Sequence, residues 1–355
     1  MRVKSLSGHD FRNLLPFNIS FSDSMNIFYG DNAQGKTNLI EALWLFTGAK
    51  SFRGAKDAEM VTFGQKNAEL DLSFISGGVE REAKISISAR RSAELDGKKL
   101  KSPILLAGTF CSTVFSPSDL AVVKEGPALR RRFIDLAIGQ LYPSYVPIIK
   151  QYVRALTQRN ALLKEMNRRL QNTEMLDVFE AEIADLGRKI INYRIKYCAH
   201  ITENASDIYK ELSSFREELE VEYQPSCLAE DLAEELYKSR RSDIFSGITS
   251  VGPHRDDLDF KINGISARTF GSQGQQRSVA LALKLAESRT LKDITGEQPV
   301  AILDDVMSEL DPARQAFILN HIKEWQVFIT SPAPSGIPIS EGKIFNVSAG
   351  KIKEI

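Results

Sequence analysis

The segment with the most evident chemistry is a glycine-bearing loop at residues 30–37. Gly30 and Gly35 let the backbone curl so that successive amide hydrogens point into one concavity, where the dipole of the following helix also favours an anion. Lys36 supplies a positive charge to β- and γ-phosphates, and the Thr37 hydroxyl is placed to ligate Mg²⁺. The loop therefore predicts ATP binding. The expected contacts are Gly30, Asp31, Asn32, Ala33, Gln34, Gly35, Lys36, Thr37 and Asn38. Gln34 is interpreted as neutral filler.

An acidic pair, Asp304 and Asp305, ends the short apolar run at 300–303 and is the usual partner of such a loop. Asp304 is expected to hold Mg²⁺ through water, and Asp305 to polarise the attacking water as a second carboxylate. Many ATPases of this type carry glutamate at the second position, so the shorter aspartate predicts slow hydrolysis. A carboxylate that only caps a helix is the alternative role for Asp305.

A second glycine-bearing turn, at 272–277, opens an apolar helix before the acidic strand. Ser272, Gly274 and Gln275 resemble the signature motif of ABC ATPases, and the Ser272 hydroxyl and the Gly274 amide can bind a γ-phosphate. Because the loop at 30–37 already surrounds the nucleotide from the other side, this half-site is expected to act in trans, within an ATP-bound homodimer. Ser272 then joins Lys36 and the two aspartates as a catalytic candidate. A helix cap without nucleotide is the alternative.

Two more segments match the same ATPase class. Residues 308–311 match the D-loop, which crosses the dimer interface in that class, and Asp311 before Pro312 is also a good helix N-cap. Thr330 stands where many ABC ATPases have a histidine. Threonine can donate a hydrogen bond there but cannot become cationic.

The elements that must position these motifs belong to an α/β fold. A short apolar strand at 25–29 enters the loop and a helix at 38–46 leaves it. Continuous apolar runs at 300–303 and 327–329 predict buried parallel strands. Alternating residues at 68–89 and the Asp96-Gly97 turn predict an antiparallel β meander. We therefore expect an ABC-type P-loop ATPase head with a mixed core sheet and this meander.

The apolar period changes after Pro143, where apolar residues recur at alternating spacings of three and four on both sides of a polar break at 171–173. This predicts two helices in a short antiparallel coiled-coil hairpin, with Asn160 and His200 on its seam. Strands return at 257–262 and 266–270. The predicted domains are the N-terminal half of the ATPase head (1–118), an inserted helical domain (119–244) and the C-terminal half of the head (245–355).

Composition narrows the function classes only slightly. The chain has 355 residues, 43% hydrophobic and 26% charged, with 46 basic and 46 acidic side chains. A DNA site would therefore have to come from local clustering of basic residues. The three cysteines are far apart and lack metal-ligand spacing, which suits buried thiols in a reducing compartment. No window approaches the ~20 apolar residues of a membrane span, so a cytoplasmic protein without membrane contact is expected.

Taken together, several segments resemble the RecF family of bacterial recombination mediators. The Gly-Pro-His-Arg-Asp-Asp stretch that leads toward Ser-Gln-Gly-Gln-Gln-Arg is the most specific of them. The matching segments are residues 9–13, 30–38 with 41–42, 51–53, 114–120, 126–127 with 130–132, 252–257 and 272–277. The resemblance implies an SMC-like ATPase head, and an ATP-dependent homodimer that binds duplex DNA and boundaries between single and double strands. It also implies cooperation with RecO and RecR in loading RecA at gaps.

The resemblance also implies roles for individual side chains. Arg12 and Asn13 are expected near the adenine or ribose, with a surface arginine as the alternative. The basic residues Lys50, Arg53, Lys56, Arg130 and Arg131 are candidates for DNA contact, and Arg130 and Arg131 could instead brace the inserted domain or lie on a solvated helix face. His254 is interpreted as a hydrogen-bonded turn residue rather than a metal ligand.

Two other functions remain open at this point. One is the nucleotide-binding subunit of a membrane transporter, although coupling to a membrane partner does not require the helical insertion. The other is an SMC-like ATPase with a different role on DNA. A nuclease is disfavoured because no spare acidic cluster follows the last core strand.

Overall fold

The computed structural model describes residues 1–168, 174–333 and 342–355. The chain divides into two compact units, and it passes between them at residues 120–121 and 279–280. We call Met1–Leu120 with Ala280–Ile355 the loop unit, and Ala121–Val279 the helical unit. The predicted insertion of a helical part into a discontinuous nucleotide-binding part is confirmed. The second boundary differs from the expected one, because residues 245–279 belong to the helical unit.

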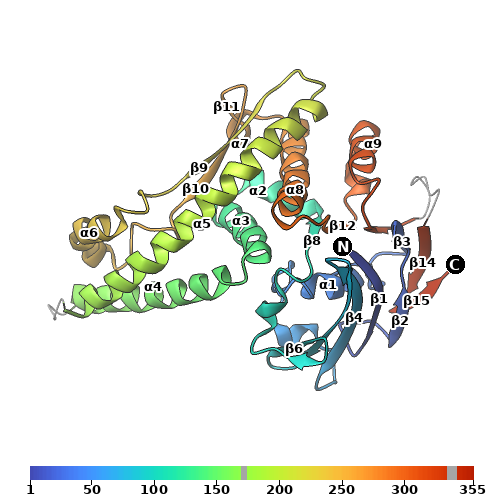
Figure 1. The fold of residues 1–355 in the computed structure, drawn as a ribbon. Helices are drawn as coiled ribbons and strands as arrows, with labels where there is room; N and C mark the ends of the chain where they lie inside the picture. The colour runs from blue at the N-terminus through green and yellow to red at the C-terminus, as the bar shows by residue number, and fades with distance from the viewer. Residues whose placement is uncertain (169–173, 334–341) are drawn as a thin grey trace. The chain divides into compact units, whose positions relative to one another are not determined.

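The core sheet of the loop unit has the order β15-β14-β3-β13-β12-β8, and all its neighbouring pairs are parallel except β14 with β15 (Figure 1). Its strands are β3 (Met25–Tyr29), β8 (Ser112–Phe115), β12 (Val300–Asp304), β13 (Val327–Ser331), β14 (Gly342–Ser348) and β15 (Lys351–Glu354). Every residue of β8 and β12 is buried, which explains the continuous apolar run at residues 300–303 of β12. The predicted parallel strands near 300 and 327 are confirmed.

A second sheet of the loop unit is antiparallel throughout, in the order β2-β1-β4-β5-β6-β7. Its strands are β1 (Arg2–His9), β2 (Phe17–Ser20), β4 (Ala68–Ser76), β5 (Val79–Ile87), β6 (Arg91–Leu95) and β7 (Lys98–Lys99). Burial alternates along β4, so one face of the sheet is packed while the other carries polar residues. This is the meander that the alternating sequence predicts. The helices of the loop unit include α1 (Lys36–Leu45) and α9 (Pro312–His321).

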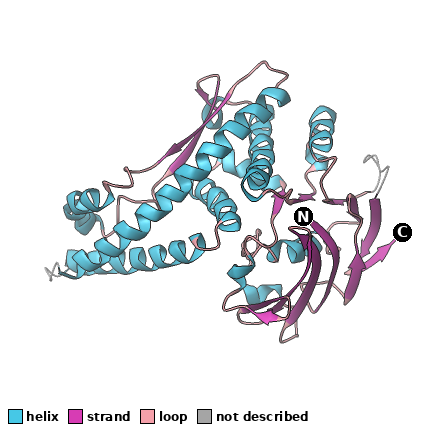
Figure 2. Ribbon diagram, in the orientation of Figure 1, coloured by secondary structure: helices cyan, strands magenta, loops and turns pink. Residues whose placement is uncertain are grey.

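The helical unit is built on a long helix pair, α4 (Tyr145–Arg168) and α5 (Glu174–Leu212), which lie side by side (Figure 2). Its other helices are α3 (Pro127–Leu141), α6 (Leu232–Ser246) and α7 (Ala267–Phe270), and its strands are β9 (Leu219–Gln224), β10 (Asp257–Ile262) and β11 (Ile265–Ser266). Two helices at the unit boundaries, α2 (Leu120–Lys124) and α8 (Gln273–Thr295), continue into the loop unit. The predicted hairpin of two helices is confirmed, and the polar break predicted between them at 171–173 lies outside the described residues.

Three local predictions about the helical unit are wrong. His200 is exposed rather than on the seam between α4 and α5. Asn160 is half-buried, and its Oδ1 accepts hydrogen bonds from the backbone and hydroxyl of Thr249, so it fixes a loop rather than the register of the helix pair. The strand predicted at 266–270 gives way to helix α7.

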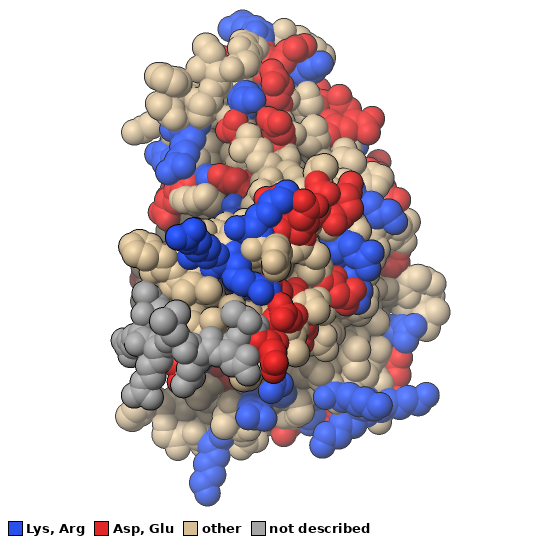
Figure 3. Space-filling view, turned by 90° about the vertical axis from the view of Figure 1, so that its left-hand side faces the viewer, with Lys and Arg blue, Asp and Glu red and all other residues tan. Residues whose placement is uncertain are grey.

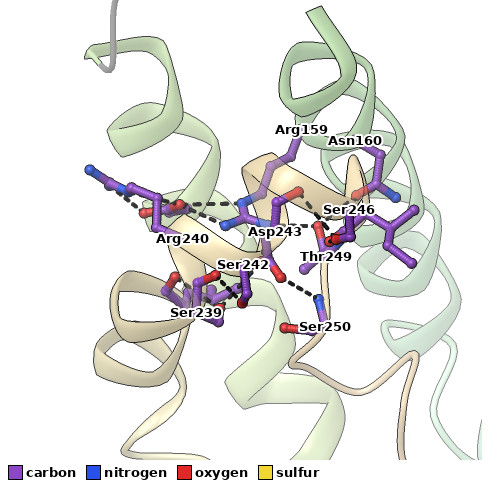
Figure 4. A network of polar contacts seen from close by, with 12 residues as sticks. Arg159, Asn160, Ser239, Arg240, Ser242, Asp243, Ser246, Thr249 and Ser250 are labelled. Carbon is purple, nitrogen blue, oxygen red and sulfur yellow. Dashed lines mark hydrogen bonds and ion pairs between the residues drawn. The ribbon is translucent and has the colours of Figure 1, made fainter. Parts of the chain in front are cut away.

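A buried charge network joins α4, α5 and α6 (Figure 4). Arg159 is fully buried, and its guanidinium lies 2.8 Å from Glu180 Oε1 and 2.8 Å from Asp243 Oδ2. The same guanidinium donates to the Thr249 hydroxyl at 2.8 Å. Because an unpaired buried charge is costly, each of these groups favours one arrangement of the three helices. Sequence periodicity gives no signal for this network, since its members look like ordinary surface charges.

Candidate nucleotide site

The glycine-bearing loop joins the end of β3 to the first residue of α1. Gly30, Ala33 and Gly35 have φ values of +152°, +65° and +115°, which side chains adopt only with strain. A Cβ at Gly30 would lie 2.1 Å from the carbonyl oxygen of Val347, so this position requires glycine for space as well. Helix α1 begins at Lys36, directly after the loop, and its unpaired first amides are available to an anion. The strand-loop-helix arrangement is confirmed.

Lys36 folds back over the start of this loop. Its ammonium donates to the carbonyl oxygens of Gly30 at 2.5 Å and Asp31 at 2.8 Å, and the residue is buried. The positive charge is thus held at the mouth of the loop, where the motif predicts the β- and γ-phosphates.

The carboxylate of Asp304 meets the loop helix, as the sequence predicts. The Thr37 hydroxyl donates to Asp304 Oδ1 at 3.0 Å, and the Thr330 hydroxyl donates to the same oxygen at 2.8 Å. Strand β13 lies between β3 and β12, so residues at the carboxyl ends of all three strands converge. Burial raises the pKa of the Asp304 carboxyl, while the hydrogen bonds from Thr330 and Thr37 act in the opposite direction.

Asp305 departs from the strand with a φ of +52°. Its amide donates to the Thr330 hydroxyl at 3.0 Å, and its carboxylate accepts from the Ser308 hydroxyl at 3.2 Å. Thr330 therefore connects the two aspartates. This is a structural role for the position at which many ABC ATPases have a histidine. Asp311 caps α9 by accepting from the Arg314 amide at 3.0 Å, as predicted.

The oxygen ligands at this point suit magnesium. Mg²⁺ is commonly held by one or two protein groups together with substrate phosphates and water. In the described residues, no group of three or more His, Cys, Asp or Glu side chains could hold a metal ion. The Thr37 hydroxyl and the Asp304 carboxylate fit an ion that completes its coordination with nucleotide oxygens.

Known proteins resemble the chain along nearly its whole length. The family model RecF/RecN/SMC N terminal domain matches residues 2–337. The DNA replication and repair protein RecF of Clostridium perfringens (strain SM101 / Type A) is 37% identical over 363 residues, covering 99% of this chain and 100% of that protein. RecF of Lactobacillus delbrueckii subsp. bulgaricus (strain ATCC 11842) is 39% identical over 361 residues, covering 97% of this chain and 95% of that protein. The chain belongs to the RecF family.

Solved structures agree with this membership. A structure of the recombination mediator protein RecF with ATP in the RecFOR pathway has a TM-score of 0.92 at 35% identity, covering 100% of this chain and 97% of that one. An SMC head bound to the C-terminal winged-helix domain of ScpA has a TM-score of 0.58 at 17% identity, over 100% of this chain and 97% of that chain, so it shows a shared fold. The RecF-family chain is an ATP-binding and ATP-hydrolysing protein of DNA replication and repair. Among the functions left open by the sequence, the transporter subunit is therefore excluded.

Two residues predicted near the base or ribose, Arg12 and Asn13, contact the loop or the helix that follows it in this RecF-family chain. The Arg12 guanidinium makes two hydrogen bonds to the buried carboxylate of Glu41, at 2.9 and 3.0 Å. Asn13 donates to the Ala33 carbonyl oxygen at 3.2 Å and accepts from the Asn38 side chain at 2.7 Å. The buried Glu41 is the partner that sequence reasoning missed.

The signature-like segment begins α8 within the helical unit. The Ser272 amide donates to Gln275 Oε1 at 2.8 Å, and the Gln275 amide donates to the Ser272 hydroxyl at 3.2 Å. This reciprocal pair is a capping box, so the local alternative of a helix cap is present in the geometry. Ser272 is nevertheless exposed, and its hydroxyl, which accepts from the Gln275 amide, keeps a proton that it can donate to an anion.

The candidate DNA contacts separate into two groups. Lys50, Arg53 and Lys56 are exposed. Arg130 is buried, with two hydrogen bonds to Asp257 at 2.6 and 2.9 Å, so its predicted contact with DNA phosphates is wrong and its bracing role holds. Arg131 is half-buried and donates to a backbone carbonyl. Acidic and basic side chains are interspersed on the face drawn in Figure 3.

The family-specific stretch at 252–257 organises the interior of the helical unit. Asp256 is fully buried and accepts from Arg194, from the Tyr223 hydroxyl and from the Ser226 amide. His254 bonds to the Tyr152 hydroxyl at 2.7 Å and to a backbone carbonyl, and burial lowers its pKa. His254 is thus a hydrogen-bonded turn residue, as predicted.

Proposed function

We propose that this RecF-family protein is an ATP-operated homodimer that clamps DNA at single-strand gaps or strand boundaries and helps RecO and RecR to load RecA. The observation that carries the proposal is the exposed cap of α8. Ser272 presents a hydroxyl and a helix N-terminus to solvent, and its hydrogen bonds to Gln275 and Gln276 lie within its own helical turn. A second copy that brings its loop-bound nucleotide to this cap would complete both half-sites.

The proposed hydrolytic site uses the loop unit's own side chains. Lys36 and the amides at the start of α1 stabilise charge on the transferred phosphate, and Thr37 with Asp304 holds Mg²⁺, which neutralises that charge when bound. Asp305 orients the attacking water. Its carboxylate is one methylene shorter than glutamate and is also engaged by Ser308, so we expect a turnover below ~1 per second, as suits a switch rather than a motor.

The energetic demand on such a switch is moderate. Moving a monomer-dimer equilibrium from 1% to 99% at fixed protein concentration takes ~5.5 kcal/mol. Two nucleotides at the interface, each contacted by both subunits, together supply this free energy. Lys50, Arg53 and Lys56 are the proposed DNA contacts of the loop unit.

The solution mass measured by light scattering tests the proposal, with no nucleotide, with ADP and with ATP plus Mg²⁺. We expect the mass to double only with ATP. Ser272→Arg should still bind ATP but stay monomeric, because the long cation blocks the cap. Ser242→Arg makes the same change at an exposed serine on α6 and should dimerise like the wild type. A mass that never changes with nucleotide, even with gapped DNA present, would overturn the switch.

A further inference from the structure

Strands β14 and β15 form an antiparallel hairpin, which we call the C-terminal hairpin, and its tip packs closely against Asn13. Ser348 pairs with Lys351, which leaves the two-residue turn Ala349-Gly350 with φ values of +48° and +76°. Such positive angles at both turn positions are typical of a type I′ hairpin turn. A Cβ at Gly350 would lie 2.1 Å from the carbonyl oxygen of Asn13, so the tip is seated closely against the segment that braces the loop.

Both turn amides of this hairpin are directed at Gln34. The Ala349 amide donates to the Gln34 side-chain oxygen at 2.5 Å, and the Gly350 amide donates to the Gln34 main-chain oxygen at 3.1 Å. The Gly350 carbonyl in turn accepts from the Leu15 amide at 3.0 Å. The interpretation of Gln34 as neutral filler is therefore wrong, because it is the residue through which the hairpin holds the loop.

These contacts determine where the loop amides point. In a planar trans peptide the carbonyl oxygen and the amide hydrogen point in opposite directions. A Gln34 carbonyl held outward by Gly350 therefore turns the Gly35 amide toward the opposite side of that peptide. The Asn13 side chain holds the Ala33 carbonyl in the same way, which fixes the Gln34 amide. Two consecutive peptides of the anion-binding loop are thus oriented from outside it.

We propose that the C-terminal hairpin is a clamp for the phosphate loop and that Gln34 is its positioning residue. The clamp sets the loop amides for phosphate before a nucleotide binds, and so reduces the ordering cost of binding. This inference rests on the proposed role of residues 30–37 as the nucleotide site. It assigns a function to the last two strands of the chain that no part of the nucleotide motif predicts.

Two variants test the clamp from its two sides. Gln34→Met keeps the length of the side chain but removes its acceptor, and Gly350→Ala pushes the tip away from Asn13. Gly97→Ala is the matched control, because Gly97 has a φ of +73° in another two-residue turn but nothing within 4 Å of an added Cβ. It carries the same backbone strain without touching the loop.

Equilibrium binding of ATP is the first readout, alongside the melting temperature. We expect both test variants to raise the ATP Kd about three- to tenfold, as for the loss of one hydrogen bond of ordinary net strength. Gly97→Ala should leave the ATP Kd unchanged, even where it lowers the melting temperature as Gly350→Ala does. An ATP Kd that follows the melting temperature equally in all three variants would overturn the clamp.

The amide resonance of Gly35, in protein labelled with ¹⁵N-glycine, is the second readout and needs no nucleotide. Gly350→Ala should shift this resonance although residue 350 is remote in sequence, whereas Gly97→Ala should not. An unshifted resonance overturns the clamp. Lys36→Ala separates this result from the proposed function. If that variant binds ATP as tightly as the wild type, the loop is not the nucleotide site, while the Gly35 resonance still decides whether the hairpin orients the loop.

Discussion

The phosphate loop and the signature-like segment both present amides at the start of a helix, but they differ in what holds them. The loop is braced by Asn13, by the C-terminal hairpin and by the Thr37–Asp304 contact. The segment at 272–275 is held by its own capping box, by bonds within the first turns of α8 and by a hydrogen bond from the Gln275 side chain to Glu217. Under the proposed dimer, this difference predicts that ATP affinity is set within one chain and that the exposed cap at Ser272 contacts the second copy.

The largest expected effect comes from removing the negative charge of Asp304 while keeping the hydrogen bonds that it accepts from Thr37 and Thr330. In Asp304→Asn the amide oxygen can still accept from Thr37 and Thr330, so the fold should persist, but the anionic ligand is lost. We expect the rate of ATP hydrolysis to fall about a thousandfold, equivalent to ~4 kcal/mol. Phosphate release under single-turnover conditions measures this. Hydrolysis within tenfold of wild type would remove Asp304 from the chemistry.

The Asp304→Asn substitution is also expected to change the stability of the fold. Because burial raises the pKa of Asp304, the folded protein binds a proton over a pH range where the unfolded chain has released it. Stability contributed by the protonated form is therefore lost as pH rises through that range, and at neutral pH the ionised group costs folding free energy. Asp304→Asn should raise the melting temperature by about 1–3 °C at pH 7.5, with the gain shrinking at pH 4. A lower melting temperature at both pH values would contradict this account.

A second substitution tests the pairing of Arg12 with the buried Glu41 rather than ATP hydrolysis. Arg12→Ala leaves the carboxylate of Glu41 buried without its bidentate partner, although Ser51 and Arg53 still lie near it. We expect a loss of about 2–3 kcal/mol in the free energy of unfolding, measured by urea denaturation. The double variant Arg12→Ala with Glu41→Gln should recover part of this loss, because the uncompensated charge is gone. No recovery would mean that Arg12 acts through packing instead.

The sequence predicted the loop, its acidic strand, the meander and the helix pair because each has a local signal in spacing or periodicity. It did not predict the partners that the fold brings together from far apart. Gln34 meets Ala349 across 315 residues, and Arg12 meets the buried Glu41. Arg130 was a candidate for DNA contact, yet its side chain is buried and hydrogen-bonded to Asp257. Charges with distant partners carry no local pattern that separates them from surface residues.

The smallest expected effect concerns Arg53, one of the proposed DNA contacts of the loop unit. Arg53 is exposed, and its guanidinium donates to the Asn38 side chain at 2.8 Å, which in turn donates to Asn13. Arg53→Glu should weaken DNA binding about three- to tenfold and flatten its dependence on salt, because fewer phosphates are neutralised. Arg90→Glu reverses a charge on the exposed turn after β5 and is the matched control.

The Arg53 substitution also tests whether DNA binding affects the contacts that hold the phosphate loop. If Arg53 leaves Asn38 to contact a phosphate, DNA should alter the environment of Asn13 and therefore the ATP affinity of the loop. Coupling of this kind is reciprocal, so ATP should change DNA affinity by the same factor, and Asn38→Ala should abolish the coupling while leaving each affinity measurable alone. DNA affinity and salt slope that match those of Arg90→Glu would place the DNA surface elsewhere, and the phosphate loop would then be braced independently of it.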